Sequence, residues 1–443
     1  MSDFRNVGIF KLGNLIDLIQ EFRISSISPH VVHAFDTAKI STAIYRRIFS
    51  REDVYMYLTG LFHDVGLVIY TGLSAPGAMS IAVKEVDVDG NVAFDLGKFL
   101  DRFDKDEIHS KVSYRIVEKF KILPEKFLKA ILYHHTPLSR IDGTDEEITI
   151  ANILSVADSV SQAMRRFMKW GFENVPKAIE EVLENVEMLP DVKSALKDLM
   201  RDMVTLRYCI DEKPYKEVFM LRDIEIGIDQ LVELLKMMAL FIDLRSPFTL
   251  RHSSAIATLS RDIAVEMFGS AFDGMIMYMA GLVHDIGKIK TPLYILHKPD
   301  KLDPHEAYVM KLHIVDTFKM LSPQKGLDEI TAIASLHHER LNGSGYPWGY
   351  KKNQLSMRSR ILQVADVFEA LLEDRPYRKA LLKDEALKII ENEVRRGKLD
   401  ANVYETLNEM IKNGYEVEKN ELVIFQFFED LKDIDQVRAI LKM

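Results

Sequence analysis

MIMYMAGLVHDIGK, residues 275–288, joins a short apolar run to a histidine and an aspartate that are adjacent, His284 and Asp285. The run from Met275 to Val283 is too short to cross a membrane, and glycine in the position of Gly287 is typical of a helix end. A related segment, His63-Asp64-Val65-Gly66-Leu67, occurs earlier in the chain. The segment 275–288 therefore predicts a helix that ends at two side chains able to bind a metal ion, and the earlier segment repeats this pair of side chains.

The two segments belong to two ordered series of histidines and aspartates. The first series comprises His33, His63, Asp64, His109, His134, His135 and Asp158. The second comprises His252, His284, Asp285, His313, His337, His338 and Asp366. A single buried histidine is most often an ordinary core residue, but that explanation does not account for seven residues repeated in the same order. The repeat is far longer than that of a solenoid, so it indicates duplication of a whole domain.

Imidazole nitrogens and carboxylate oxygens are ligands that first-row transition metals accept. Seven such side chains are too many for one tetrahedral site, and they suit a pair of ions with a carboxylate between them. Each series therefore predicts a metal centre.

The overall composition is that of an ordinary globular protein, with 47% apolar and 28% charged residues among 443. A net charge of −9 argues against broad binding of nucleic-acid polymers or anionic membranes, because phosphate surfaces select basic faces. The only cysteine is Cys209, so no intrachain disulfide can form, and the N-terminus does not resemble a signal peptide. We expect a cytoplasmic protein without a membrane span.

Helical periodicity dominates the chain. One apolar stripe consists of Leu231, Leu234, Leu235, Met238 and Phe241. A different pattern surrounds Asp89-Gly90, a turn dipeptide flanked by alternating apolar residues, and it predicts a small β-hairpin inserted in the first repeat. The predicted fold class is therefore all-α, with two tandem helical bundles. We place the domains at residues 1–208 and 209–443, with a linker over 209–219.

Four motifs in the second repeat carry a family resemblance. They are His284-Asp285-Ile286-Gly287-Lys288, His337-His338-Glu339-Arg340-Leu341-Asn342-Gly343-Ser344-Gly345-Tyr346-Pro347, Val364-Ala365-Asp366 and Arg375-Pro376-Tyr377-Arg378. In this combination the chain resembles the HD superfamily of metal-dependent phosphohydrolases. The second repeat resembles its HD-GYP branch, the bacterial cyclic dinucleotide phosphodiesterases. The first repeat resembles only the HD skeleton, so the two bundles are expected to be of HD type.

The resemblance implies two divalent metal ions in the second domain, with iron or manganese favoured. One ion would be held by His252, His284, Asp285 and Asp366, and the other by Asp285, His313, His337 and His338. Some members of the branch bind a third ion through a glutamate four residues before the first histidine, where this chain has Phe248. Asn342 departs from the usual aspartate, which puts the turn that carries Tyr346 in doubt, and Ile314 departs from the proline that often follows the third histidine. Neither departure is expected to abolish the chemistry.

The resemblance also implies the chemistry. A hydroxide bridging the two ions would attack phosphorus in line, with Asp285 and Lys288 as catalytic residues. The residues implied to contact substrate are Lys288, Tyr346, Arg375 and Arg378. The favoured substrate is cyclic di-GMP, opened to a linear dinucleotide or cleaved twice to the mononucleotide.

The first repeat keeps every candidate metal ligand and loses every candidate phosphate ligand. Leu67 stands at the position of Lys288, and Phe167 and Trp170 stand at the positions of Arg375 and Arg378. His134-His135 is followed by Thr136-Pro137-Leu138, with no Gly-Tyr-Pro. We predict a degenerate domain that is regulatory or structural, with a candidate second metal site.

Other functions fit the same ligands. The chain could be a phosphohydrolase for another phosphate ester, a di-iron oxygenase, or a non-catalytic scaffold that senses a nucleotide or a metal. Lys288, Arg375 and Arg378 favour a phosphate-containing substrate over a neutral carbon substrate. The sequence does not determine which cyclic dinucleotide or metal is used, and a homodimer is only one of several open oligomeric states.

Overall fold

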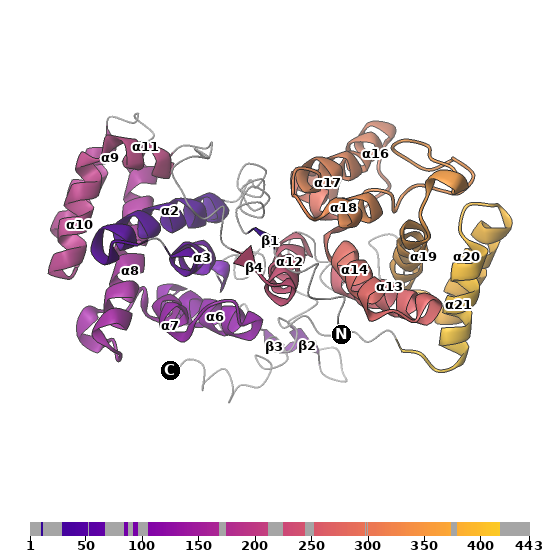
Figure 1. Cartoon of the computed structure of the whole chain (residues 1–443), viewed down its shortest axis with the longest axis horizontal. Coiled ribbons are helices and arrows are strands. Elements are labelled where there is room, and N and C mark those ends of the chain that lie inside the picture. Colours follow the sequence, from indigo (N-terminus) through magenta and orange to yellow (C-terminus); the bar gives the residue numbers. More distant parts are fainter. Residues whose placement is uncertain are drawn as a thin grey trace. The chain divides into compact units, whose positions relative to one another are not determined.

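A computed structural model describes residues 10–11, 29–51, 53–66, 84–86, 92–95, 105–167, 174–210, 225–243, 252–296, 298, 300–373 and 379–416. These residues form two compact units. The N-terminal unit contains residues 29–210, and the C-terminal unit contains residues 10–11 and 225–416. Both units are mainly helical (Figure 1), which confirms the prediction of two helical bundles.

The N-terminal unit is built around α2 (Pro29–Phe49), which packs against α3 (Val54–Phe62) and α8 (Asp145–Phe167). The bundle is completed by α6 (Lys105–Phe120), α7 (Glu125–Tyr133), η2 (Leu138–Arg140), α9 (Val175–Asn185), α10 (Pro190–Arg201) and α11 (Met203–Ile210). Asp53 caps α3 by accepting a hydrogen bond from the backbone N–H of Tyr55 at 3.0 Å. The aromatic side chains of Phe35, Tyr45 and Phe127 are buried in the core.

Two short strands, β2 (Lys84–Val86) and β3 (Val92–Asp95), pair antiparallel in the stretch where the β-hairpin is predicted, with Lys84 opposite Asp95. The predicted turn Asp89-Gly90 lies outside the described residues. The linker predicted from Cys209 to Phe219 is described only as far as Ile210, where α11 ends with Cys209 buried.

The C-terminal unit has the same central arrangement. Its α13 (His252–Phe268) packs against α14 (Ala271–Val283) and α19 (Met357–Leu372). The other elements are β1 (Phe10–Lys11), β4 (Glu225–Ile226), α12 (Ile228–Asp243), η6 (Ile286–Lys290), α15 (Leu293–Leu296), α16 (Pro304–Lys311), α17 (His313–Leu321), α18 (Asp328–Ala334), η7 (Lys352–Gln354), α20 (Lys383–Arg395) and α21 (Ala401–Lys412). In α12 the predicted apolar stripe is buried at Leu231, Leu234, Leu235 and Met238.

A glycine lets the central helices approach closely in both units. A Cβ atom on Gly281 of α14 would lie 2.5 Å from the Cα of Ala257 on α13. A Cβ atom on Gly60 of α3 would lie 2.5 Å from the Cα of Ala38 on α2. Since no larger residue fits at these crossings, the glycines set the distance between the helices that carry the first two histidines of each series.

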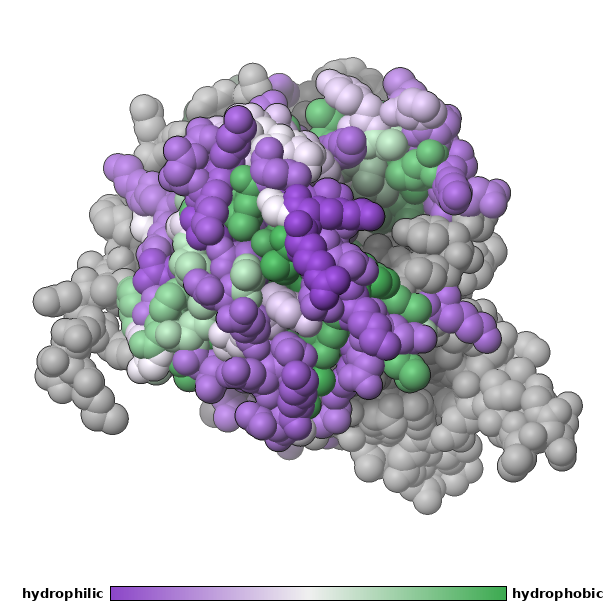
Figure 2. All heavy atoms as spheres, turned by 90° about the vertical axis from the view of Figure 1, so that its right-hand side faces the viewer, coloured by the Kyte–Doolittle hydropathy of each residue, from purple (hydrophilic) through white to green (hydrophobic). Residues whose placement is uncertain are grey.

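Hydrophilic side chains dominate the face of the C-terminal unit that carries α20 and α21, with apolar patches between them (Figure 2). Among the described helices, none has both the length and the apolar character needed to cross a membrane.

Candidate metal centre

Five elements of the C-terminal unit bring the second series together at the end of α14. His252 begins α13, and His284 and Asp285 follow the last residue of α14. His313 begins α17, His337 and His338 follow α18, and Asp366 lies within α19. Helix ends and starts thus supply most of the candidate ligands, so ligands adjacent in sequence need not share one face of a helix.

Asp285 lies at the centre of this cluster. Its Oδ2 is 3.2 Å from the Nε2 of His284 and 3.7 Å from the Nε2 of His252. Its Oδ1 is 3.3 Å from the Nε2 of His313 and 3.9 Å from the Nε2 of His337. The two oxygens of one carboxylate therefore face two different groups of imidazoles.

Asp366 completes the cluster. Its Oδ1 lies 3.7 Å from the Nε2 of His252, and its Oδ2 lies 3.8 Å from the Nδ1 of His338. Three groups of side chains have ligand atoms within 4.8 Å of one another: His252, His284 and Asp366; His284, Asp285 and His337; and His313, His337 and His338. These groups overlap, as expected where ions share ligands.

Three of the histidines have their outer nitrogen fixed by the backbone. The Nδ1 atoms of His284, His313 and His337 contact the carbonyl oxygens of Gly281, Met310 and Ala334 at 2.7, 2.5 and 2.6 Å. A carbonyl only accepts, so each Nδ1 carries the proton and each Nε2 presents a lone pair to the cluster.

The inner atoms of the cluster fit a metal ion. The buried Nε2 atoms of His284, His313 and His337 and the Oδ1 of Asp285 have no hydrogen-bond partner. Unsatisfied buried polar atoms are costly. A cation that accepts their lone pairs would remove this cost.

The electrostatics around Asp285 favour neutral imidazoles at His313 and His337 beside an ionised aspartate. Burial lowers the pKa of His313 to about 4 and that of His337 to about 3. Burial alone would raise the pKa of Asp285, but Lys288 and His284 outweigh it and hold that pKa well below its ordinary value. Neutral imidazole and ionised carboxylate are the forms that bind metals.

Two predicted substrate-contact residues lie beside the cluster. The Lys288 ammonium, on η6, forms an ion pair with Asp285 and is partly exposed. The Tyr346 ring lies 4.9 Å from the His338 ring, and the ammonium of Lys311 lies 5.1 Å from the centre of the Tyr346 ring. Burial raises the pKa of Tyr346, so its hydroxyl stays protonated at neutral pH.

A buried glutamate anchors the loop that carries Tyr346. Glu339 Oε1 accepts a hydrogen bond from the backbone N–H of Trp348 at 2.8 Å, and Oε2 accepts one from Tyr350 at 2.9 Å. Gly345 lies so close to Glu339 that a Cβ atom there would be 2.4 Å from the Glu339 Cα. The Gly-Tyr-Pro segment is therefore held against the residue that follows the two histidines.

The first series forms a similar cluster in the N-terminal unit. Asp64 Oδ1 lies 3.3, 3.2 and 3.8 Å from the Nε2 atoms of His63, His109 and His134. The Nε2 atom of His33 lies 2.6 Å from Asp158 Oδ1. Two groups in this unit, His33 with His63 and Asp64, and His109 with His134 and His135, have ligand atoms within 4.8 Å of one another.

Comparisons with known proteins agree with this geometry. The HD domain family matches residues 31–163 and again residues 236–403. The 3'3'-cGAMP-specific phosphodiesterase 1 of Vibrio cholerae is 32% identical over 303 residues, which is 63% of this chain and 69% of that protein. The chain belongs to the HD-GYP branch of the HD superfamily.

Two further proteins are similar to this HD-GYP chain over different shares of its length. The cyclic di-GMP phosphodiesterase of Thermotoga maritima is 36% identical over 201 residues, and the match covers 45% of this chain and about half, 52%, of that protein. The crystal structure of a cyclic GMP-AMP-specific phosphodiesterase of V. cholerae, V-cGAP3, matches 92% of this chain and 100% of its own with a TM-score of 0.54. Its sequence identity is 18%, so this likeness shows the fold alone.

All candidate metal ligands predicted for the HD-GYP chain lie in the described residues and converge in their two units. Lys288 and Tyr346 lie beside the second cluster, as expected from their motifs. Arg375 and Arg378 lie outside the described residues, as do Leu67, Trp170 and Phe248. Phe167, predicted to replace a phosphate-binding residue in the first domain, is the last residue of α8.

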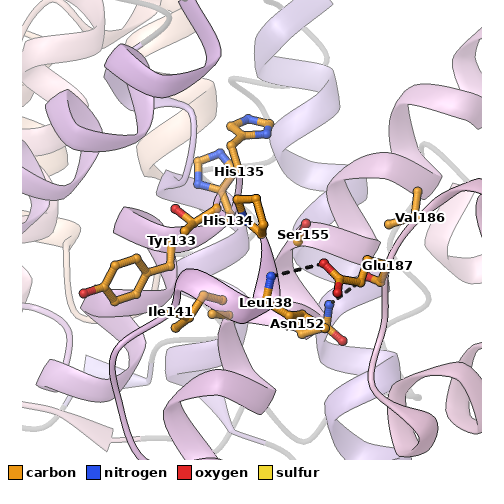
Figure 3. Close-up of a pocket in the computed structure, with 12 residues that line it drawn as sticks. Tyr133, His134, His135, Leu138, Ile141, Asn152, Ser155, Val186 and Glu187 are labelled. Atoms are coloured by element: carbon orange, nitrogen blue, oxygen red, sulfur yellow. Dashed lines mark hydrogen bonds between the residues drawn. The ribbon is translucent and has the colours of Figure 1, made fainter.

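The N-terminal unit has a pocket of about 240 Å³ beside His134 and His135 (Figure 3). Its wall is fixed by the Asn152 amide, which donates to the Glu187 carbonyl at 3.2 Å, and by the Glu187 carboxylate, which accepts from the Leu138 N–H at 3.2 Å. Of the described residues that line it, none is lysine or arginine, and Glu187 is the one carboxylate. The charge of the pocket lining therefore does not favour binding of a phosphodiester.

Sequence reasoning missed two carboxylates near the second cluster. One is Glu339, although it lies within the motif that runs from His337 to Pro347. The other is Glu373, whose Oε2 lies 3.3 Å from the Nδ1 of His252. Burial lowers the pKa of His252 while Glu373 raises it, and the resulting value is about 9. Only the spacing of Glu373, seven residues or two helical turns after Asp366, could have drawn attention to it.

Proposed function

We propose that the C-terminal unit is a metal-dependent phosphodiesterase that hydrolyses a cyclic dinucleotide. The observation that carries the proposal is Asp285, whose two carboxylate oxygens face separate sets of imidazoles. Family membership and the names of the relatives support the same activity.

The proposed cofactor is a pair of divalent ions, iron or manganese. His252, His284 and Asp366 would hold one ion, and His313, His337 and His338 would hold the other, with Asp285 shared. Two such ions activate water at neutral pH and neutralise charge that develops on the phosphate.

The chain's own residues then orient the substrate. The Lys288 ammonium is three residues from the shared aspartate and would pair with a non-bridging phosphate oxygen. Tyr346, with its proton retained, would donate a hydrogen bond or support the substrate against His338. Arg375 and Arg378 are proposed to bind the second phosphate.

The similar proteins support a cyclic dinucleotide as the substrate class. Which two nucleobases the substrate carries can be tested. The family resemblance favours cyclic di-GMP, whereas the similar proteins include phosphodiesterases for 3'3'-cGAMP and for cyclic di-GMP. These two molecules share the cyclic diphosphate that the proposed centre would contact and differ in one base. We therefore propose the class and expect both members to be bound.

We further propose the division of labour between the domains, with residues 1–208 regulatory or structural and residues 209–443 catalytic. The N-terminal cluster resembles the second one in geometry, so a structural metal is proposed there. Absence of a lysine or arginine among the described lining of its pocket supports a non-catalytic role.

A direct experiment tests the activity. Full-length protein loaded with Mn²⁺, or with Fe²⁺ under anaerobic conditions, is incubated with cyclic di-GMP and with 3'3'-cGAMP, and the products are separated by chromatography. We expect linear dinucleotide or mononucleotide from at least one substrate, and none from the Asp285→Asn variant. If the metal-loaded protein leaves both substrates intact, the proposal is wrong.

A further inference from the structure

The outer nitrogens of the C-terminal histidines do not all have the same kind of partner. His284, His313 and His337 each contact the carbonyl oxygen of the residue three positions earlier. His252, the first residue of α13, has a different kind of partner. Its Nδ1 instead faces the carboxylate of Glu373 at 3.3 Å.

The fold brings Glu373 to this place through the helix that also carries a metal ligand. Asp366 lies in α19, and Glu373 follows the last residue of that helix, two helical turns further on. Asp366 faces the Nε2 of His252 at 3.7 Å, while Glu373 faces its Nδ1. One helix thus contacts both nitrogens of the same imidazole. Both carboxylates are largely buried, with 11% and 13% of their side chains exposed.

We propose that Glu373 is a positioning residue for the metal centre, which fixes the ring of His252 with its Nε2 toward the metal. The observed contact is an ion-pair contact at 3.3 Å. A carboxylate that accepts the proton of the outer nitrogen of a metal-binding histidine fixes its tautomer and makes it a more basic ligand, and this is the role proposed for Glu373. The inference rests on the proposed function only in that the cluster binds metal ions.

The N-terminal unit provides a natural contrast. There the Nδ1 of His33, the matching first histidine, contacts the neutral hydroxyl of Ser161 at 2.8 Å. The residue seven positions after Asp158, which corresponds to Glu373, is Arg165. A carboxylate facing the Nδ1 of the first histidine is therefore a feature of the proposed catalytic unit, whereas His33 has a hydroxyl at that nitrogen.

A double-mutant cycle on the full-length protein tests the proposal. Metal-free wild type, Glu373→Ala, His252→Ala and the double variant are titrated with Mn²⁺, and bound metal is measured by calorimetry and by elemental analysis. Because outer partners of metal ligands typically contribute about 10- to 100-fold in affinity, Glu373→Ala should weaken binding of one Mn²⁺ by about that factor. In the His252→Ala background the same change should have no further effect, since Glu373 acts through His252.

Two further variants separate positioning from a general loss of charge or of folding. Glu373→Gln keeps a side chain that can hydrogen-bond and should retain more affinity than Glu373→Ala. Glu405→Gln makes the same chemical change at an exposed position of α21 and should bind Mn²⁺ as wild type does. The melting temperature of each metal-free variant reports its folding.

Wild-type affinity in Glu373→Ala would overturn the proposal. So would an equal loss of affinity in both backgrounds, because Glu373 would then bind metal independently of His252. Since the readout is Mn²⁺ binding, a protein that binds metal normally and fails to cleave cyclic dinucleotides would contradict the proposed function while leaving this inference standing.

Discussion

At the scale of single residues, Asp285 determines what the centre can do. Its Oδ2 faces His252, His284 and Lys288, and its Oδ1 faces His313 and His337. A carboxylate that reaches two sets of ligands can be shared by two ions, whereas the ammonium group of Lys288 donates hydrogen bonds and offers no acceptor to a metal. Substitutions at these two positions should therefore have different effects on metal binding.

We predict that Lys288→Ala keeps its metal and loses rate. Removal of one group that stabilises charge in a transition state typically lowers kcat by about 100- to 1000-fold. Steady-state hydrolysis of the cyclic dinucleotide, together with metal analysis of the same preparation, checks the prediction. Lys325→Ala, at an exposed lysine, is the control. A Lys288 variant with normal kcat would show that the phosphate does not lie beside η6.

A second residue-scale prediction concerns Asp243, whose carboxylate accepts hydrogen bonds from the Ser253 hydroxyl at 2.8 Å and the Ser253 N–H at 3.3 Å. Burial raises its pKa to about 8 in the folded protein, against about 4 when unfolded. The folded state therefore binds the proton more tightly, and this group's contribution to stability falls as the pH rises from about 4 to about 8.

Asp243→Asn keeps an acceptor for Ser253 and removes the titration. The melting temperature of the metal-free variant, relative to metal-free wild type, should therefore rise steadily from pH 5 to pH 8. Differential scanning calorimetry across this range measures it. A difference that is constant with pH would contradict the raised pKa.

The residues of the centre also show what a sequence can reveal. The two clusters of candidate metal ligands could be predicted because two ordered series and adjacent pairs such as His337-His338 leave a pattern in the chain. Glu373 could not, because it lies far in sequence from His252, and nothing local indicates that α19 brings it there. The role of Glu339 depends on its hydrogen bonds to the backbone of Trp348 and Tyr350. These bonds form only when the loop folds back over Glu339, so the sequence does not indicate them.

At the scale of elements, the central helix crossing fixes the spacing of the first two histidines in each series. Gly281 and Gly60 permit the close approach of α13 to α14 and of α2 to α3. The sequence predicted α14 from its apolar run. It did not predict the crossings, since the need for glycine arises only when the neighbouring helix is in place.

We predict that Gly281→Ala pushes α14 away from α13 and separates His284 from His252. An added methyl group in a tight core typically costs about 1–3 kcal/mol of stability. Activity and metal content should fall with it. Gly60→Ala creates the same clash in the N-terminal unit and should cost similar stability while leaving hydrolysis much less affected. Thermal unfolding, metal analysis and kcat/KM measure these effects, and equal losses of activity in the two variants would contradict the assignment of catalysis to one unit.

The loop from Glu339 to Tyr350 is the second element whose position matters. Glu339→Ala leaves the backbone N–H groups of Trp348 and Tyr350 without their acceptor, and each unsatisfied group typically costs about 1–3 kcal/mol. We predict a less stable protein whose KM for the cyclic dinucleotide rises more than its kcat falls, because Tyr346 loses its fixed place. Urea unfolding and steady-state kinetics test this, with Glu405→Ala as the control; an unchanged KM would mean that the loop does not contact substrate.

At the scale of the whole molecule, the described residues contain two clusters of candidate metal ligands, and the sequence has candidate phosphate ligands only in the second repeat. Duplication, and the loss of Lys288 and Gly-Tyr-Pro equivalents from the first copy, could be predicted because each is a comparison of aligned residues. The exact domain boundary could not, since residues 211–224 contain no motif. Under the proposed division of labour between the domains, similar ligand clusters with different surroundings imply that metal binding alone does not make a domain catalytic.

A matched pair of variants tests that implication. Asp285→Asn and Asp64→Asn remove the same charge from the central position of each cluster. We predict that Asp285→Asn loses metal from the C-terminal unit and abolishes hydrolysis. Asp64→Asn should lose metal only from the N-terminal unit and keep kcat within a few-fold of wild type. Metal analysis and kinetics on full-length proteins distinguish the two. If Asp64→Asn were as inactive as Asp285→Asn while still folded, the first domain would take part in the reaction, and its lack of phosphate-binding residues would need another explanation.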